Sequence, residues 1–221
     1  IPIGLSYRNT SNPSYKIFKV SAKEFIKMKG LDNEELGKVL LSKKAVIENT
    51  VKATIETDYE EHSSLIALPA LQNGQYYLVF SNNDKFTNIE DLLFTLFQVS
   101  NLSYVTLNTK DHLNAYVVNR ETGAHISGVM AHFSQKEYNY KTKDYEYRDL
   151  FDTVSDKNGI VTLFKDPYGY FSIDLFYKND TLLACSKEDF SINNMRENMS
   201  LKTDIFTDRA IYRPGQTVHF K

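Results

Sequence analysis

Short runs of alternating apolar and polar residues, each closed by a turn signal, recur between residues 110 and 202. Ile126–Phe133 and Tyr170–Tyr177 alternate as strands with one buried face do. Asn158-Gly159 is a strong signal for a two-residue β-hairpin turn, and Asn119–Gly123 predicts another turn. Strands that recur about every ten residues with turns between them favour a compact antiparallel β-sandwich.

The preceding block, residues 1–109, also has strand character but carries a short helical insertion. Ser21, with Glu24 three residues later, predicts a capping box at the start of a helix that ends at Gly30. A second short helix is expected over Asn33–Leu41. The expected strands include Ala45–Thr57, Ser64–Leu68, Tyr76–Ser81 and Leu92–Leu102. This block is therefore predicted to be a β-sandwich with short helices.

The last segment, residues 203–221, reads as an extended run, a turn and the opening of a strand. In Arg213-Pro214-Gly215-Gln216, proline fixes φ and glycine accepts the positive φ of a type II turn. Thr217–Phe220 then alternates like a strand with one buried face. Since no partner follows Lys221, we expect this segment to be the first strand of a third domain in a longer chain.

The run Thr207–Lys221, TDRAIYRPGQTVHFK, resembles the start of a macroglobulin domain in the α2-macroglobulin family, most closely the large bacterial members. The hairpin-like pattern Leu68–Val79 and the run Phe97–Ser103 are similar to the closing strands of such domains. The resemblance implies an all-β chain of tandem antiparallel β-sandwich domains, immunoglobulin-like or fibronectin-III-like. Its domains are expected at residues 1–109, 110–202 and 203–221. The motif residues, to which a structural role is assigned, are Asp208, Arg209, Tyr212, Arg213, Pro214, Gly215 and Gln216.

Composition excludes several classes of partner and location. The formal net charge of −2 is spread along the chain without a long basic run, which argues against nucleic acid as a partner. No apolar stretch approaches the roughly 18 residues of a transmembrane helix. The chain starts at Ile1 without a signal-like segment, so any targeting segment is expected outside this sequence. The single cysteine, Cys185, excludes a disulfide within the chain.

No residue pattern predicts a catalytic, cofactor or metal site. Complete members of the resembled family often carry a reactive thioester in a C-G-E-Q turn, but Cys185 lies in an apolar, strand-like setting and is predicted to be a buried thiol. No histidine pair has metal-ligand spacing beside a suitable partner, and His132 and His219 are read as sheet residues. The histidines are His62, His112, His125, His132 and His219.

Two acidic segments resemble metal loops only superficially. Asp58, Glu60 and Glu61 lack the glycine of a calcium loop and are expected to form a solvated turn before the strand at Ser64. The chemistry of a hairpin turn accounts for Asp156–Gly159 without an ion. We therefore expect no cofactor.

The Tyr-rich stretch Gln135–Arg148 leaves two alternatives open. Its tyrosines alternate with lysines and, if they face one way, could form a contact patch for protein or glycan. Alternatively, they cover the sheet of their own sandwich or a neighbouring domain. These residues are Tyr138, Tyr140, Tyr145 and Tyr147.

The resemblance implies a non-catalytic scaffold within an extracytoplasmic, periplasmic or cell-surface protein that is anchored to the envelope. Its partners would be neighbouring macroglobulin domains and, through the whole protein, target proteases that are trapped after bait cleavage. The alternative function is a surface module that binds protein or glycan through the Tyr-rich hairpin. An enzyme ranks last, because no catalytic constellation is recognisable.

Overall fold

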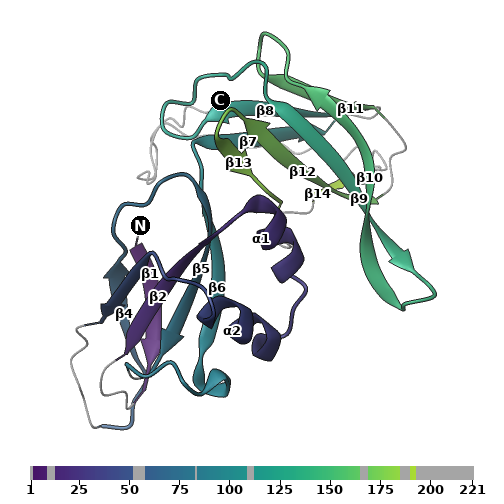
Figure 1. Ribbon diagram of the computed structural model, residues 1–221. Coiled ribbons are helices and arrows are strands. Elements are labelled where there is room, and N and C mark those ends of the chain that lie inside the picture. The colour runs from purple at the N-terminus through teal and green to yellow at the C-terminus, as the bar shows by residue number, and fades with distance from the viewer. Residues whose placement is uncertain are drawn as a thin grey trace, which may run out of the picture.

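The structure is a computed structural model that describes residues 2–8, 13–51, 58–82, 84–108, 112–164, 169–184 and 190–192. The family motif, Asp208 to Gln216, the expected first strand of a third domain, and Cys185 all lie outside the described residues. The described chain forms two β-rich halves, and Figure 1 shows helices only in the half that contains the N-terminus.

The first half is built in three layers. A four-stranded antiparallel sheet of order β3-β2-β5-β6 lies between the two-stranded ribbon β1-β4 and the helices (Figure 1). Its elements are β1 (Pro2–Tyr7), β2 (Ser14–Val20), α1 (Ala22–Met28), α2 (Asn33–Leu41), β3 (Ile47–Thr50), β4 (His62–Ala67), β5 (Gly74–Ser81), the 3-10 turn η1 (Ile89–Asp91) and β6 (Leu93–Val99).

The central strand β5 is buried on both faces, which explains its nearly continuous apolar sequence, QYYLVF. Tyr77 and Val79 point into the core beneath the helices. Tyr76 and Leu78 point to the opposite core, beneath the β1-β4 ribbon. The period of two along one strand thus divides the first half into two apolar cores.

The predicted helices are confirmed. Ser21 Oγ accepts from the Glu24 N–H at 3.2 Å, and a Glu24 carboxylate oxygen accepts from the Ser21 N–H at 2.9 Å, which completes the capping box. Hydrogen bonds from Lys43 and Ser21 lower the pKa of Glu24 to about 2. The helices are more than an insertion, because Phe25, Met28 and Leu40 form one side of a core.

The second half is a sandwich of two antiparallel sheets. One has the order β11-β8-β7, and the other has the order β10-β9-β12-β13 with β14 also paired to β12. Between them lies one core that includes Leu113, Phe133 and Ile173. The strands are β7 (Leu102–Asn108), β8 (His112–Asn119), β9 (Met130–Asn139), β10 (Asp144–Val154), β11 (Ile160–Phe164), β12 (Gly169–Tyr177), β13 (Asp180–Leu182) and β14 (Phe190–Ile192).

The expected strand Leu92–Leu102 is in fact two strands that belong to different halves. β6 ends at Val99 and pairs with β5, whereas β7 begins at Leu102 and pairs with β8. The chain leaves one sheet and enters the other at Ser100 and Asn101, where the Leu102 N–H donates to Ser100 Oγ. The strand pairing therefore changes from one half to the other near residue 100. The domain boundary expected at residue 109 stays a prediction.

Among the described residues, no helix is long and apolar enough to cross a membrane.

A matched pair of glycines tests the packing of the Asn158-Gly159 turn. Gly123 and Gly159 have similar φ angles, 71° and 75°. A Cβ on Gly159 would lie 2.7 Å from the Val117 carbonyl oxygen, whereas a Cβ on Gly123 would have no neighbour within 4 Å. Gly123→Ala should lower the free energy of unfolding by roughly 1–2 kcal/mol, the penalty for a left-handed backbone alone. Gly159→Ala should lower it by about 1–3 kcal/mol more, because β8 must move.

Urea unfolding of the two variants measures the difference. Equal losses would show that the β8 backbone yields without cost, contrary to the packing described here.

Candidate functional site

The link between the two halves is short and held by hydrogen bonds. The Asn101 N–H donates to Asp180 Oδ2 at 2.8 Å. The Arg120 guanidinium donates to the carbonyl oxygens of Ser100 at 3.1 Å and Leu102 at 3.0 Å. The Arg120 N–H also donates to the Asn101 carbonyl oxygen at 2.7 Å. Residues of the second half therefore hold the backbone of the link, residues 100–102, in place.

The segment Thr181–Ala184 docks onto the first half through its main chain. Gln98, on β6, accepts from the Leu183 N–H at 2.8 Å and donates to the Leu183 carbonyl oxygen at 2.7 Å. Gln75, on β5, donates to the Thr181 carbonyl oxygen at 3.1 Å. Lys29, at the end of α1, donates to the Ala184 carbonyl oxygen at 3.2 Å. Three elements of the first half thus satisfy backbone groups of one segment of the second.

Side chains of the second half also complete a core of the first. Leu183 is fully buried and belongs to the cluster of Phe25, Met28 and Tyr77 beneath the helices. Phe176, on β12, packs against the same cluster. Burial of apolar area is the main favourable term in such contacts. The junction therefore combines an apolar anchor with a hydrogen-bonded backbone, and we take it as the candidate functional site of a structural module.

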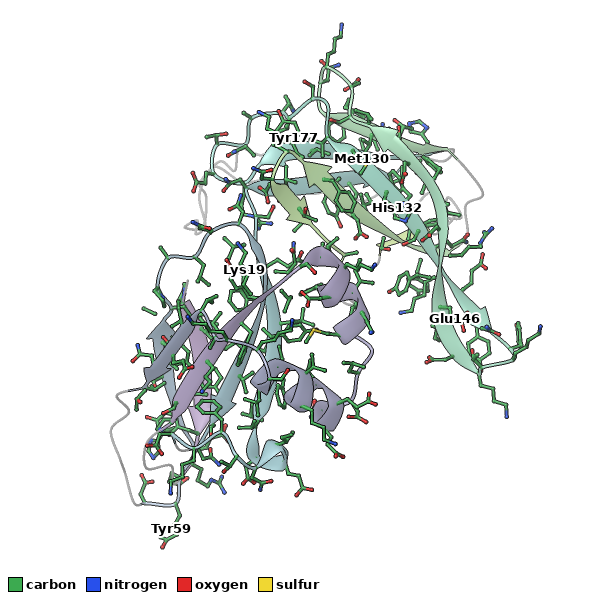
Figure 2. All side chains as sticks on the ribbon, in the orientation of Figure 1. Lys19, Tyr59, Met130, His132, Glu146 and Tyr177 are labelled. Atoms are coloured by element: carbon green, nitrogen blue, oxygen red, sulfur yellow. The ribbon has the colours of Figure 1, made fainter. Side chains whose placement is uncertain are left out.

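A polar hollow of about 490 Å³ lies beside the junction. Figure 2 labels Lys19 on the first half and Tyr177 on the second, and both line it. Asn73, Asn101 and Asp180 also line it. Among its described lining residues, no nucleophile is paired with a general base.

The Tyr-rich stretch forms an arm, the β9–β10 hairpin, that extends from the second half past the side of the first half where the helices lie (Figure 1). Tyr138 lies opposite Tyr145 and Lys136 lies opposite Tyr147, so these four side chains share one face of the hairpin. Tyr140, in the turn, lies edge-on to Tyr138 with ring centroids 5.1 Å apart. The four predicted tyrosines are therefore brought together.

Two lysines lie near the tyrosine rings of the arm, one from the arm itself and one from the first half. The Lys136 ammonium lies 5.3 Å from the Tyr145 ring centroid and 5.8 Å from that of Tyr147. The Lys29 ammonium, from the first half, lies 5.7 Å from the Tyr147 ring centroid. Lys29 thus contacts both the docked segment and the arm.

The opposite face of the arm is polar and internally paired. The Arg148 guanidinium donates to Glu137 Oε1 at 2.8–2.9 Å and to Gln135 Oε1 at 3.1 Å. Glu146, labelled in Figure 2, accepts from the Asn139 amide at 2.9 Å. The arm therefore has one aromatic face and one charged face.

His132 lies on the tyrosine-bearing side of β9, nearer the sandwich. Its Nδ1 is 2.6 Å from Asp152 Oδ1 and its Nε2 is 3.2 Å from Asp149 Oδ1. Burial by itself lowers the pKa of His132, but these hydrogen bonds outweigh it and raise the pKa above the ordinary value. The neighbouring Asp174 is largely buried, which raises the pKa of its carboxyl although the Ala184 N–H donates to it at 2.6 Å.

No known family profile and no curated protein matches this sequence. Solved structures do match the fold. A crystal structure of native alpha-2-macroglobulin from Escherichia coli spanning domains NIE-MG1 gives a TM-score of 0.60 at 18% identity, over 83% of this chain and 88% of that one. The chain has the fold of these two domains. A structure of the same protein spanning MG0-NIE-MG1 gives 0.61 at 17% identity, over 83% of this chain and 57% of that one.

The NIE-MG1 likeness confirms the predicted fold class. Of the predicted site residues, the structure describes the four tyrosines, whereas the motif residues between Asp208 and Gln216 lie outside the described residues. The four tyrosines are exposed, from 41% for Tyr138 and Tyr147 to 86% for Tyr140, so they do not form the core of their own sandwich. Their role as a contact patch stays a prediction. Asp58 forms an exposed turn, as expected, with its carboxylate bonded to the Glu60 N–H and to His62.

Sequence reasoning missed the junction residues. Gln75, Gln98 and Lys29 carry no motif, and only the burial of Gln75 within an apolar strand sets it apart. The sequence pattern predicted His132 to be an ordinary sheet residue and did not predict its contacts with the carboxylates of Asp149 and Asp152. Within the described ranges, no group of three or more histidine, cysteine or acidic side chains could hold a metal ion.

Removing the Gln98 side chain tests the junction. Gln98→Ala leaves the buried N–H and carbonyl of Leu183 without these partners, which should lower the free energy of unfolding by about 1–3 kcal/mol. The control is Gln72→Ala, an exposed glutamine on the β4–β5 connection. Urea unfolding measures the stability of both variants. Equal stability of the two would show that the hydrogen bonds between Gln98 and the main chain of Leu183 do not stabilise the junction.

Truncating the exposed tyrosines tests whether they stabilise the fold. Tyr140→Ser combined with Tyr145→Ser should change the free energy of unfolding by less than about 0.5 kcal/mol per site, as for most surface residues. In the control, Tyr76→Ser removes a buried ring stacked on Phe97 and should cost about 3–5 kcal/mol. A comparable loss in the arm variant would mean that these rings serve packing.

Proposed function

We propose that this chain is a non-catalytic scaffold segment of an alpha-2-macroglobulin-like protein. The observation that carries the proposal is the extent of the structural likeness, which covers 88% of the NIE-MG1 structure and so includes both halves. A likeness confined to one sandwich would be weaker support, because such sandwiches serve many unrelated functions.

The physical task of such a segment is to hold two domains in one relative orientation. Interfaces between domains usually allow relative motion unless they are apolar and extensive. Here the Leu183 side chain shares a core with the helices, and the main chain of Thr181–Ala184 is hydrogen bonded to β5, β6 and α1. A force or displacement applied to one half is therefore transmitted to the other.

The whole protein would then be an extracytoplasmic endopeptidase inhibitor that is anchored to the envelope and traps proteases after bait cleavage. This part of the proposal rests on the resemblance of Thr207–Lys221 to macroglobulin domains together with the fold. The partners of this segment are neighbouring macroglobulin domains, and proteases interact with the complete protein.

Size-selective inhibition tests this function on the full-length protein that contains the chain. After incubation with trypsin, a trap should block cleavage of a large protein substrate by at least about tenfold, while cleavage of a small chromogenic peptide continues; a tenfold effect corresponds to about 1.4 kcal/mol. The isolated 221-residue chain serves as the control and should block neither substrate.

Two results would overturn the proposal. One is equal inhibition of large and small substrates, which indicates a blocked active site instead of a trap. The other is inhibition, or hydrolysis of a peptide, ester or glycoside panel, by the isolated chain.

A further inference from the structure

We infer that His132 is a pH-sensitive latch at the root of the arm, which in its imidazolium form ties together the two parts of β10 and holds the arm in place. This role is independent of protease inhibition. It rests on the geometry of one histidine, two carboxylates and a β-bulge.

Both ring nitrogens of His132 face carboxylate oxygens. Nδ1 lies 2.6 Å from Asp152 and Nε2 lies 3.2 Å from Asp149. Ionised carboxylates only accept hydrogen bonds, and a neutral imidazole carries a single N–H. Both contacts can be hydrogen bonds at the same time only when the ring is doubly protonated. The geometry therefore selects the charged form of His132.

The two carboxylates stand on opposite sides of a break in the strand. The register of β10 against β9 shifts between Asp149 and Phe151, which marks a β-bulge. Asp152 pairs with His132 itself, on the sandwich side of the bulge, while Asp149 pairs with Ser134, on the arm side. His132 thus bridges a point at which strands bend and twist more readily.

This bridge lies in the three-stranded part of the sheet, just before the sheet narrows to a two-stranded arm. β12 pairs with β9 only as far as Lys136, and the strand continues to Asn139 with β10 as its partner. A two-stranded ribbon is weakly stable on its own. The direction of the arm therefore depends on the contacts at its root, among which the His132 bridge spans the bulge.

The other charged groups around His132 come from β12 and α1. Asp174 lies directly across from His132 on β12 and is attracted to it electrostatically. Lys29, from α1, interacts with Asp174, bonds to the Ala184 carbonyl oxygen and contacts the Tyr147 ring. Three carboxylates, those of Asp149, Asp152 and Asp174, thus surround two cations, the His132 imidazolium and the Lys29 ammonium. When His132 loses its proton, Lys29 is the one cation of this group that remains beside the three carboxylates.

The direction of the pH effect follows from the raised pKa of His132. A group whose pKa is higher in the folded protein contributes its full stabilisation at low pH and loses it as pH rises through the folded pKa. Above that pH the neutral ring keeps one N–H, and one of the two carboxylates loses its donor. Because the side chains of Asp149 and Asp152 are largely exposed, the effect is local to the arm.

The test follows the His132 ring and the arm by NMR on the 221-residue chain. The titration midpoint of the His132 ring should fall in Asp149→Asn and Asp152→Asn. It should stay unchanged in Asp144→Asn, which removes a carboxylate from β10 near the tip. Amide exchange of Tyr145 and Tyr147, corrected for intrinsic rates and divided by that of Ile173 and Leu175 in the core, should rise about two- to fivefold as pH passes the midpoint.

His132→Asn, which keeps a hydrogen-bond donor but does not titrate, should make the exchange ratio independent of pH. The inference is overturned if the midpoint is the same in Asp152→Asn as in the unaltered chain. It is equally overturned if the exchange ratio of the unaltered chain does not change across the midpoint.

Discussion

The docking of Thr181–Ala184 onto the first half determines how the rest of the molecule is arranged. It places Leu183 in a core that already contains Phe25 and Tyr77, and it satisfies main-chain groups that would otherwise be buried without partners. The short link at Ser100 and Asn101 then has little freedom left, because residues of the second half bind it. These contacts join the two halves through both the link and the docked segment.

The same arrangement accounts for the layered first half. Since the helices and the β1-β4 ribbon cover opposite faces of one sheet, β5 has no face left for solvent. The helices also provide Lys29, whose ammonium reaches both the docked segment and the arm. The helices thus complete a core of the first half and, through Lys29, also contact the second half.

Sequence patterns were informative wherever a local rule decides the structure. The capping box at Ser21 depends on neighbours in the chain and was predicted correctly. The β-hairpin predicted at Asn158-Gly159 was wrong: a turn forms there, but the strands on either side of it, β10 and β11, pair with β9 and β8 in different sheets, which only long-range contacts decide. The change of sheet near residue 100 was not predicted, because it depends on long-range pairing, of β6 with β5 and of β7 with β8. The partners of Gln98 and His132 are likewise distant in sequence, so no local pattern could reveal them.

The clamp by Gln75, Gln98 and Lys29 has a consequence for how such proteins diverge. Since these side chains recognise carbonyl and N–H groups of Thr181–Ala184, which every residue type except proline possesses in full, the docked residues other than the buried Leu182 and Leu183 are largely free to mutate. Substitution is restricted mainly at the residues that bind this main chain, Gln75, Gln98 and Lys29. An inter-domain geometry encoded in this way can persist while most of the sequence drifts, and the 18% identity to a protein of the same fold is the degree of divergence that it would permit.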